Sequence, residues 1–77
     1  MRIRVSDPAR LQSLIRYLRE VGCIAEQASE HTLDVFMPGV PTQREARMEL
    51  GVYLMAWRVR NPGVEAKLLT PPPPEVG

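Results

Sequence analysis

The sequence predicts an α+β fold, a four-stranded antiparallel sheet with two helices on one of its faces. Three observations predict this class. Four short segments have the composition of strands, and three of them alternate apolar and polar residues as half-buried strands do. Two longer segments repeat apolar residues at helical spacing. The six segments follow in the order β-α-β-β-α-β, and right-handed crossovers then place both helices on the same side of the sheet.

The first predicted strand covers residues 1–5, and a helix follows it almost at once. Asp7 is a favoured N-cap residue, and Pro8 is favoured at the first helical position because its missing N–H would have no partner there. The apolar residues of this helix share one narrow arc: Leu11, Leu14, Ile15, Leu18 and Val21. Gly22, directly after them, predicts the end of the helix.

Two further strands are predicted at residues 23–28 and 32–37. The first is the weaker of the two, whereas the second alternates apolar and polar residues clearly. The polar turn between them is short enough for a hairpin. The sequence Pro-Gly-Val-Pro at 38–41 then breaks the chain.

A long second helix is predicted from Thr42 to about Arg60. Thr42 and Glu45 have the spacing of a capping box, in which each side chain accepts a hydrogen bond from a backbone amide of the other. The sequence Asn-Pro-Gly at 61–63 ends this helix. Residues 64–70 alternate apolar and polar residues and form the last predicted strand.

The predicted order is that of the ferredoxin-like βαββαβ sandwich, which fills residues 1–70 as one domain. Prolines at 71–74 cannot join a sheet ladder, so residues 71–77 are expected to form a proline-rich C-terminal tail. The sheet residues expected to face the helices are Ile3, Val5, Leu33, Val35, Val64, Ala66 and Leu68. Those expected to face outward are Arg2, Arg4, Asp34, Phe36, Glu65, Lys67 and Leu69.

The second predicted helix has two apolar sides. One side, expected to join the core, holds Ala46, Leu50, Tyr53, Leu54 and Trp57. The opposite side holds Met48, Val52, Met55 and Val59, with Arg44, Arg47 and Arg58 beside them. A helix in a two-layer fold buries one face, and an exposed apolar patch with a charged rim is typical of a protein interface. We therefore predict an interface at these seven residues. The alternative is that the first helix or the tail covers the apolar side within one chain.

The composition limits the possible functions. Ten basic and nine acidic side chains give a net charge of +1, which argues against a protein held to nucleic acid mainly by phosphate neutralisation. A single cysteine cannot form an internal disulfide and is typical of a reducing cytoplasm. We see neither a signal peptide nor the run of ~20 apolar residues that crosses a bilayer. We expect a cytoplasmic protein with no membrane partner.

No pattern of catalytic or metal-binding residues stands out. Heavy-metal-binding proteins of this topology carry Cys-x-x-Cys after the first strand, where this chain has Ser-Asp-Pro-Ala at 6–9. Cys23 and His31 alone are too few ligands for a zinc site. A paired nucleophile and base is also lacking. We therefore expect a protein that is not an enzyme and that uses no metal or cofactor.

The outward face of the sheet offers an alternative function. RNA-recognition motifs share this topology and stack bases on aromatic residues of the central strands. Here the outward face combines the aromatic Phe36 with the basic residues Arg2, Arg4 and Lys67. These four residues would carry nucleic-acid binding, although a single aromatic platform and the near-neutral charge argue against it.

The segment from Val5 to Leu11, followed by that from Leu18 to Ile24, resembles ACT domains. These regulatory modules typically have an Asp, a Pro and an apolar residue after the first strand, and a helix that ends in Gly before the second strand. The resemblance implies side-by-side dimers and a small ligand, often an amino acid, bound at the interface near the first loop. The residues at that loop are Asp7, Ala9, Arg10 and Leu11, and many ligand-binding members have a glycine where Ala9 or Arg10 stands.

The sequence thus predicts a non-enzymatic module that works by protein association. Its partner is expected to be a second copy of the chain or another protein. A ligand-sensing module like the ACT domains and a nucleic-acid binder remain as alternatives.

Overall fold

The computed structural model describes residues 1–69 of the chain. Its elements in order are β1 (Arg2–Val5), the 3₁₀ turn η1 (Pro8–Arg10), α1 (Leu11–Glu20), β2 (Ile24–Gln27), β3 (Thr32–Phe36), α2 (Gln43–Arg60) and β4 (Ala66–Leu68). The predicted proline-rich tail at 71–77 lies outside the described residues.

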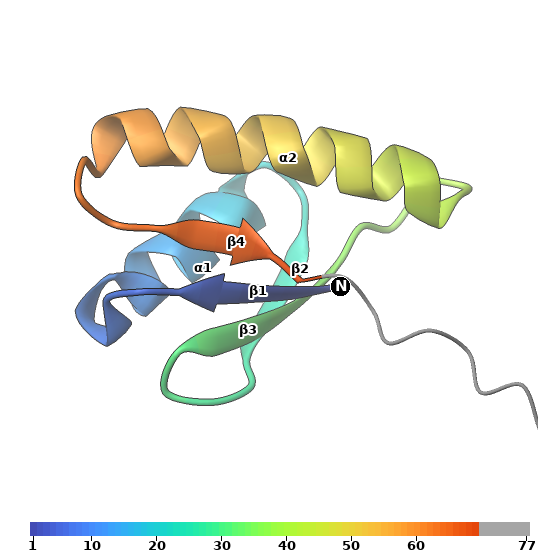
Figure 1. The fold of residues 1–77 in the computed structure, drawn as a ribbon. Helices are drawn as coiled ribbons and strands as arrows, with labels where there is room; N and C mark the ends of the chain where they lie inside the picture. Colours follow the sequence, from blue (N-terminus) through green and yellow to red (C-terminus); the bar gives the residue numbers. More distant parts are fainter. Residues whose placement is uncertain (70–77) are drawn as a thin grey trace, which may run out of the picture.

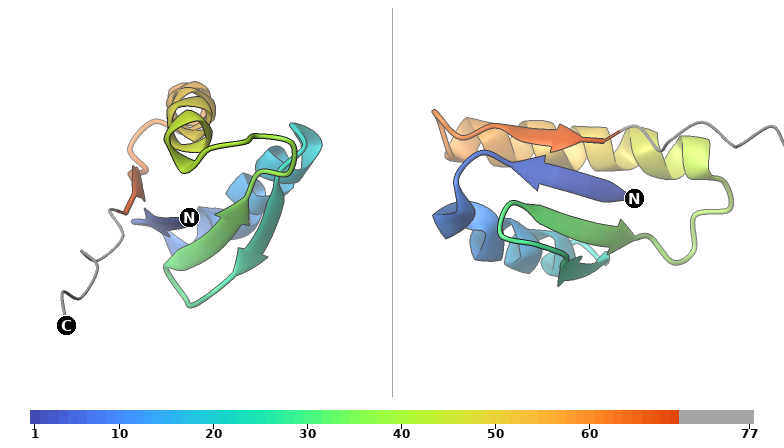
Figure 2. Two further views of the ribbon diagram at one scale, coloured as in Figure 1. Left: turned by 90° about the vertical axis from the view of Figure 1, so that its right-hand side faces the viewer. Right: turned by 60° about the horizontal axis from the view of Figure 1, so that its bottom comes forward.

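The four strands form one sheet in the order β2-β3-β1-β4, and every neighbouring pair is antiparallel. Both helices pack on the same face of this sheet (Figures 1 and 2). The predicted ferredoxin-like βαββαβ sandwich is therefore confirmed. The order leaves β2 and β4 as the two edge strands, with α2 running along β4 (Figure 1).

The first helix is correctly predicted at its end and begins later than expected. The Asp7 carboxylate accepts a hydrogen bond from the Ala9 amide at 2.9 Å, and the Arg10 amide donates to the Asp7 carbonyl at 3.0 Å. These short-range bonds close a 3₁₀ turn, so the α-helix starts at Leu11 and not at Pro8. At the other end Gly22 has a φ of 97°, a left-handed conformation that glycine adopts at little cost and that ends the helix.

The second helix has the predicted ends, and the last strand is shorter than predicted. The Thr42 hydroxyl accepts a hydrogen bond from the Glu45 amide at 3.2 Å, which confirms that half of the capping box. The predicted strand at 64–70 corresponds to β4 at 66–68: Leu69 lies just past its end, and the prediction of residues 64 and 65 as strand is wrong. Their amides bond elsewhere: the Val64 amide donates to the Asn61 carbonyl at 3.2 Å, and the Glu65 amide donates to the Ser6 hydroxyl at 2.9 Å.

The core lies between the sheet and the two helices. Its buried members are Ile3, Val5, Leu11, Leu14, Ile15, Leu18, Cys23, Ala25, Leu33, Val35, Met37, Ala46, Leu50, Leu54, Trp57 and Ala66. Val64 and Leu68, predicted to face the helices, are partly buried against this core. Tyr53 of α2 is also partly buried and meets Tyr17 of α1 edge to face, with ring centroids 6.5 Å apart. The core side predicted for the second helix is thus confirmed.

Within residues 1–69, neither helix combines the length and the apolar character that a membrane crossing requires. The cytoplasmic location remains a prediction.

Candidate protein-interaction surface

The side of α2 that faces away from the core carries four exposed apolar side chains. Met48, Val52, Met55 and Val59 are 67%, 65%, 64% and 78% exposed, and we call these four residues the α2 stripe. The core side of the same helix is almost completely covered, with Leu50 and Leu54 fully buried. The alternative that α1 covers the stripe is therefore wrong. By contrast, α1 buries its own apolar arc and shows no second one.

The four residues of the α2 stripe have the spacing of a helix that packs against another helix. Their positions follow one another at intervals of four, three and four residues. This is the alternation of a and d positions in a coiled coil, where each apolar side chain inserts between side chains of the facing helix. At a rise of ~1.5 Å per residue the stripe is about 16 Å long. The surface is therefore suited to a short contact with a helix.

Gly51 lies beside the α2 stripe in the middle of an 18-residue helix. A Cβ atom added at this position would meet nothing within 4 Å, so packing within the chain does not require a glycine there. Glycine in a helix interior costs roughly 1 kcal/mol relative to alanine. Gly51 was not singled out from the sequence, although a glycine inside a strong helix pattern lowers helix stability and is visible in the sequence for that reason.

Two of the three arginines predicted to rim the interface are bonded to backbone carbonyls in β4 or directly after it. Arg58 donates from Nε and Nη2 to the Ala66 carbonyl at 3.1 and 2.6 Å. Arg47 donates to the Leu69 carbonyl at 3.2 Å. Arg44 is exposed near the start of the helix. The guanidinium groups of Arg47 and Arg58 are thus held on the sheet side of α2, and their role at an interface stays a prediction.

The other edge of the sheet has the same kind of contact. Arg19, in the last turn of α1, donates from Nε and Nη2 to the Ala25 carbonyl of β2 at 3.1 and 2.9 Å. The Glu65 carbonyl accepts from the Ser6 amide, and Lys67 stands opposite Arg4 of β1. Because backbone groups alternate sides along a strand, the Ala66 carbonyl between them points to the free edge of the sheet. Edge strands with unpaired backbone groups pair readily with other strands, and a guanidinium on the edge carbonyl opposes this. Each edge strand is therefore partly closed to strand pairing.

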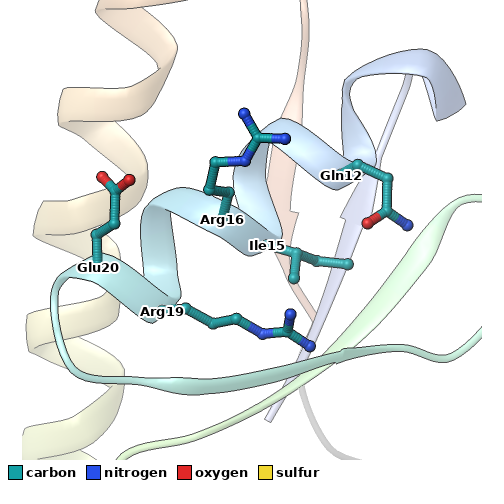
Figure 3. Close-up of a pocket in the computed structure, with 5 residues that line it drawn as sticks. All are labelled: Gln12, Ile15, Arg16, Arg19 and Glu20. Atoms are coloured by element: carbon teal, nitrogen blue, oxygen red, sulfur yellow. The ribbon is translucent and has the colours of Figure 1, made fainter.

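A depression lies on α1 beside the β2 edge. It has a volume of about 380 Å³ and is lined by Gln12, Ile15, Arg16, Arg19 and Glu20 (Figure 3). Two of its polar side chains bond to β2: the Gln12 amide donates to the Gln27 side chain at 3.0 Å, and Arg19 bonds to the Ala25 carbonyl as described above. Gln12 and Arg19 thus connect α1 to β2 and are engaged within the chain.

The outward face of the sheet carries charged side chains and one pair of apolar side chains. Arg2 and Asp34 form a bidentate ion pair, with Nε to Oδ1 at 2.9 Å and Nη2 to Oδ2 at 3.3 Å. The hydrogen bond from Arg2 holds the pKa of the Asp34 carboxyl below its usual value. Ile24 and Phe36 face each other across β2 and β3 and are 51% and 62% exposed.

The remaining residues predicted for nucleic-acid binding lie on the other half of this face. Arg4 of β1 stands opposite Lys67 of β4, and both are exposed. Arg2 is the third basic residue of the set, and its charge is balanced by Asp34. Within residues 1–69 this face therefore presents the aromatic ring of Phe36 and two cations outside the Arg2–Asp34 ion pair, which leaves nucleic-acid binding as weak an alternative as the sequence suggested.

The first loop holds the residues that the ACT resemblance assigns to a ligand. The Asp7 carboxylate is bonded to the Ala9 amide, as described above, and Leu11 is 1% exposed in the core. Arg10 and the side chain of Ala9 are exposed. Ligand binding by these four residues stays a prediction.

Metal binding has no visible basis in the part of the chain that the structure describes. Within residues 1–69, no group of three or more His, Cys, Asp or Glu side chains is placed to hold a metal ion. Cys23 is buried directly before β2. Burial raises the pKa of the Cys23 thiol, and the nearby Glu49 carboxylate adds to this shift.

No family model, no curated protein and no solved structure matches the chain. The βαββαβ topology agrees with the resemblance to ACT domains. Membership of that family stays a prediction.

Proposed function

We propose that the protein is a non-enzymatic association module that forms a homodimer through the α2 stripe. One observation carries this proposal: the four side chains of the stripe are 64–78% exposed on a helix whose other side is fully used by the core. Fully burying one such side chain stabilises a complex by roughly 1.5–3 kcal/mol. An exposed stripe of this kind is therefore a strong candidate for burial against a partner.

The length of the stripe sets the expected affinity. A stable complex commonly buries about 800 Å² on each partner, which a contact about 16 Å long does not reach. Association also costs at least about 4 kcal/mol of lost translational and rotational freedom. We therefore expect a weak dimer, with a dissociation constant of roughly 10 μM to 1 mM.

The two alternative functions receive less support. In the first loop, the carboxylate that would bind an amino acid already accepts a backbone hydrogen bond. On the sheet face, Asp34 balances the charge of Arg2. Neither region combines exposed apolar surface with the regular spacing found on α2.

The proposal is tested by placing one charge on the stripe. Val52→Glu buries a carboxylate in the dimer, while glutamate is at least as good a helix former as valine. Gln43→Glu is the matched control, since it adds the same charge to an exposed position on the other side of α2.

Size-exclusion chromatography with light scattering, at concentrations up to about 1 mM, measures the outcome. We expect Val52→Glu to remain a monomer at concentrations where the wild type and Gln43→Glu dimerise. Circular dichroism should show the same helix content in all three proteins. Equal dimerisation of Val52→Glu and the control would contradict the proposal.

A further inference from the structure

We propose that the two copies pack α2 against α2 in parallel orientation, with Arg44 of each copy bound to Glu45 and Glu49 of the other. This inference rests on the proposed homodimer and adds its orientation and its ion pairs. Two observations carry it: the charged side chains on either side of the α2 stripe, and an acidic depression at the start of the helix.

The outer side of α2 is open along its whole length. Figures 1 and 2 show no other helix or strand of the described chain over this side. A second α2 can therefore lie along the stripe in either direction. About a two-fold axis, each stripe residue of a parallel pair lies level with its own copy, whereas an antiparallel pair sets Met48 level with the partner's Val59. Apolar residues meet in both cases, so the charges beside the stripe distinguish the two orientations.

Arg44 and Glu45 are the charged residues of α2 that lie closest to the stripe. At 3.6 residues per turn both are about 50° from the centre line of the stripe, one on each side. Arg58 lies about 90° round on the side of Arg44, and Glu49 lies about 90° round on the side of Glu45. We call the side with Arg44 and Arg58 the basic flank and the side with Glu45 and Glu49 the acidic flank.

In the parallel pair the basic flank of each helix faces the acidic flank of the other. Arg44 then lies almost level with the partner's Glu45 and about 7.5 Å along the axis from the partner's Glu49. In heptad terms Arg44 and Glu49 occupy g and e positions, whose side chains form salt bridges between the helices of a coiled coil. The two-fold axis produces these contacts twice.

The antiparallel pair has no such match. Its register sets Arg44 and Glu45 level with residues 63 and 62 of the partner, beyond the end of α2. The acidic flank would then meet the partner's Arg60, but the basic flank would face itself, with Arg58 near the partner's Arg47. The helix dipoles favour antiparallel packing, although this effect is screened by salt and confined to the end turns. Attractive contacts without a repulsive counterpart therefore occur only in the parallel pair.

A depression at the start of α2 offers a place for the partner's guanidinium group. It has a volume of about 320 Å³ and is lined by Gly39, Val40, Pro41, Glu45, Met48 and Glu49. Both carboxylates of the acidic flank thus adjoin the first apolar residue of the stripe. An arginine has a long apolar stem and a planar head that binds carboxylates, so it suits both parts of this lining.

The charged groups that would meet here are not engaged within the chain. Within residues 1–69 the salt bridge is that of Arg2 with Asp34, so Arg44, Glu45 and Glu49 form none. All three side chains are exposed. Arg44 also differs from the other two predicted rim arginines, which donate to backbone carbonyls of their own chain. Its guanidinium is therefore available to a partner.

Exchanging the charges tests the ion pairs. Arg44→Glu sets carboxylates against carboxylates, and Glu49→Arg sets guanidinium groups against each other, so each variant should dimerise at least about tenfold more weakly than the wild type. An equimolar mixture of the two variants should form the mixed dimer more tightly than either forms its own, because each bridge regains an opposite pair. The double variant Arg44→Glu/Glu49→Arg should likewise recover dimerisation.

Arg16→Glu is the matched control for the exchange. It makes the same change of charge at an exposed position of α1, and arginine and glutamate are similarly good helix formers. Sedimentation equilibrium should give this variant the dissociation constant of the wild type. If Arg44→Glu dimerises as tightly as Arg16→Glu, or if the mixture is no tighter than the single variants, the ion pairs are overturned.

Disulfide cross-linking tests the orientation separately. All variants carry Cys23→Ala, which removes the native thiol, and one added cysteine. A disulfide needs Cα atoms about 4.4–6.8 Å apart. In the parallel pair Met48→Cys lies level with its own copy, whereas in the antiparallel pair the two copies are about 16 Å apart along the helix. We expect Met48→Cys and Val59→Cys each to cross-link with itself on mild oxidation.

The outcomes separate the orientation from the proposed function. A mixture of Met48→Cys and Val59→Cys that gives mainly the mixed disulfide, detected by its mass, would overturn the parallel orientation and leave the homodimer in place. A dimer that neither variant cross-links would place the contact elsewhere and overturn this inference. A wild-type chain that stays monomeric would overturn the proposed function as well.

Discussion

Replacing Gly51 by alanine should stabilise the monomer. Gly51 lies inside α2, outside the set of glycines with positive φ, and an added Cβ would meet nothing within 4 Å. The substitution therefore causes neither strain nor a clash, and it removes conformational freedom from the unfolded chain. The expected gain is roughly 0.5–1 kcal/mol, as for glycine to alanine in a helix interior. For a domain of this size, 1 kcal/mol raises Tm by about 4–8 °C.

Urea unfolding followed by the fluorescence of the buried Trp57 measures this change. The protein concentration should stay at about 1 μM, far below the expected dissociation constant, so that only the monomer contributes. The midpoint should rise while the slope m stays constant, because the surface exposed on unfolding is the same.

Gly22→Ala is the matched control. An added Cβ would again meet nothing within 4 Å, but Gly22 has a φ of 97°. Alanine in a left-handed conformation costs about 1–2 kcal/mol, so this variant should be destabilised. A Gly51→Ala protein that is no more stable than the wild type, or a Gly22→Ala protein that is stabilised equally, would refute the reasoning from backbone conformation.

Three further predictions follow from individual contacts. In NMR titrations the Asp34 carboxyl should have a pKa below its usual value, and Arg2→Gln should raise this pKa towards normal. The stabilisation from this pair should be present above the usual carboxyl pKa and lost as the pH falls through the lowered one. Cys23 should react with a thiol reagent far more slowly in the native than in the unfolded protein. Because its pKa is raised in the folded state, stability should fall as the pH rises above the usual thiol pKa, where the unfolded chain ionises first. Thr42→Ala removes the side-chain cap of α2 and should cost roughly 1 kcal/mol in urea unfolding, whereas no loss would show that the cap contributes little.

The ends of most elements could be predicted because local chemistry decides them. Gly22 and Thr42 act through backbone conformation or through a hydrogen bond three residues away. The start of β4 depends instead on Ser6, which is 59 residues from Glu65 in the sequence and binds its amide. Such a contact forms only when the whole sheet is assembled. The alternation of apolar and polar residues in the last segment therefore predicted a strand that is longer than β4.

In the candidate site, too, some features follow from local sequence and others depend on the assembled fold. Helical periodicity shows that α2 has two apolar sides, and the exposure of the α2 stripe confirms which side the core leaves open. The bonds from Arg19 and Arg58 to the edge carbonyls could not be predicted, because the sequence does not state which strands become edges. Gly51 could have been noticed in the sequence as a glycine inside a helix. Only the structure shows that a Cβ atom at this position would meet nothing within 4 Å.

Sedimentation equilibrium of the wild-type chain over a wide range of concentrations tests the central claim most directly. The account predicts a weight-average mass that rises from the monomer value of 8.7 kDa towards twice that value, with a dissociation constant of roughly 10 μM to 1 mM. A mass that stays at 8.7 kDa up to about 1 mM would contradict self-association through α2.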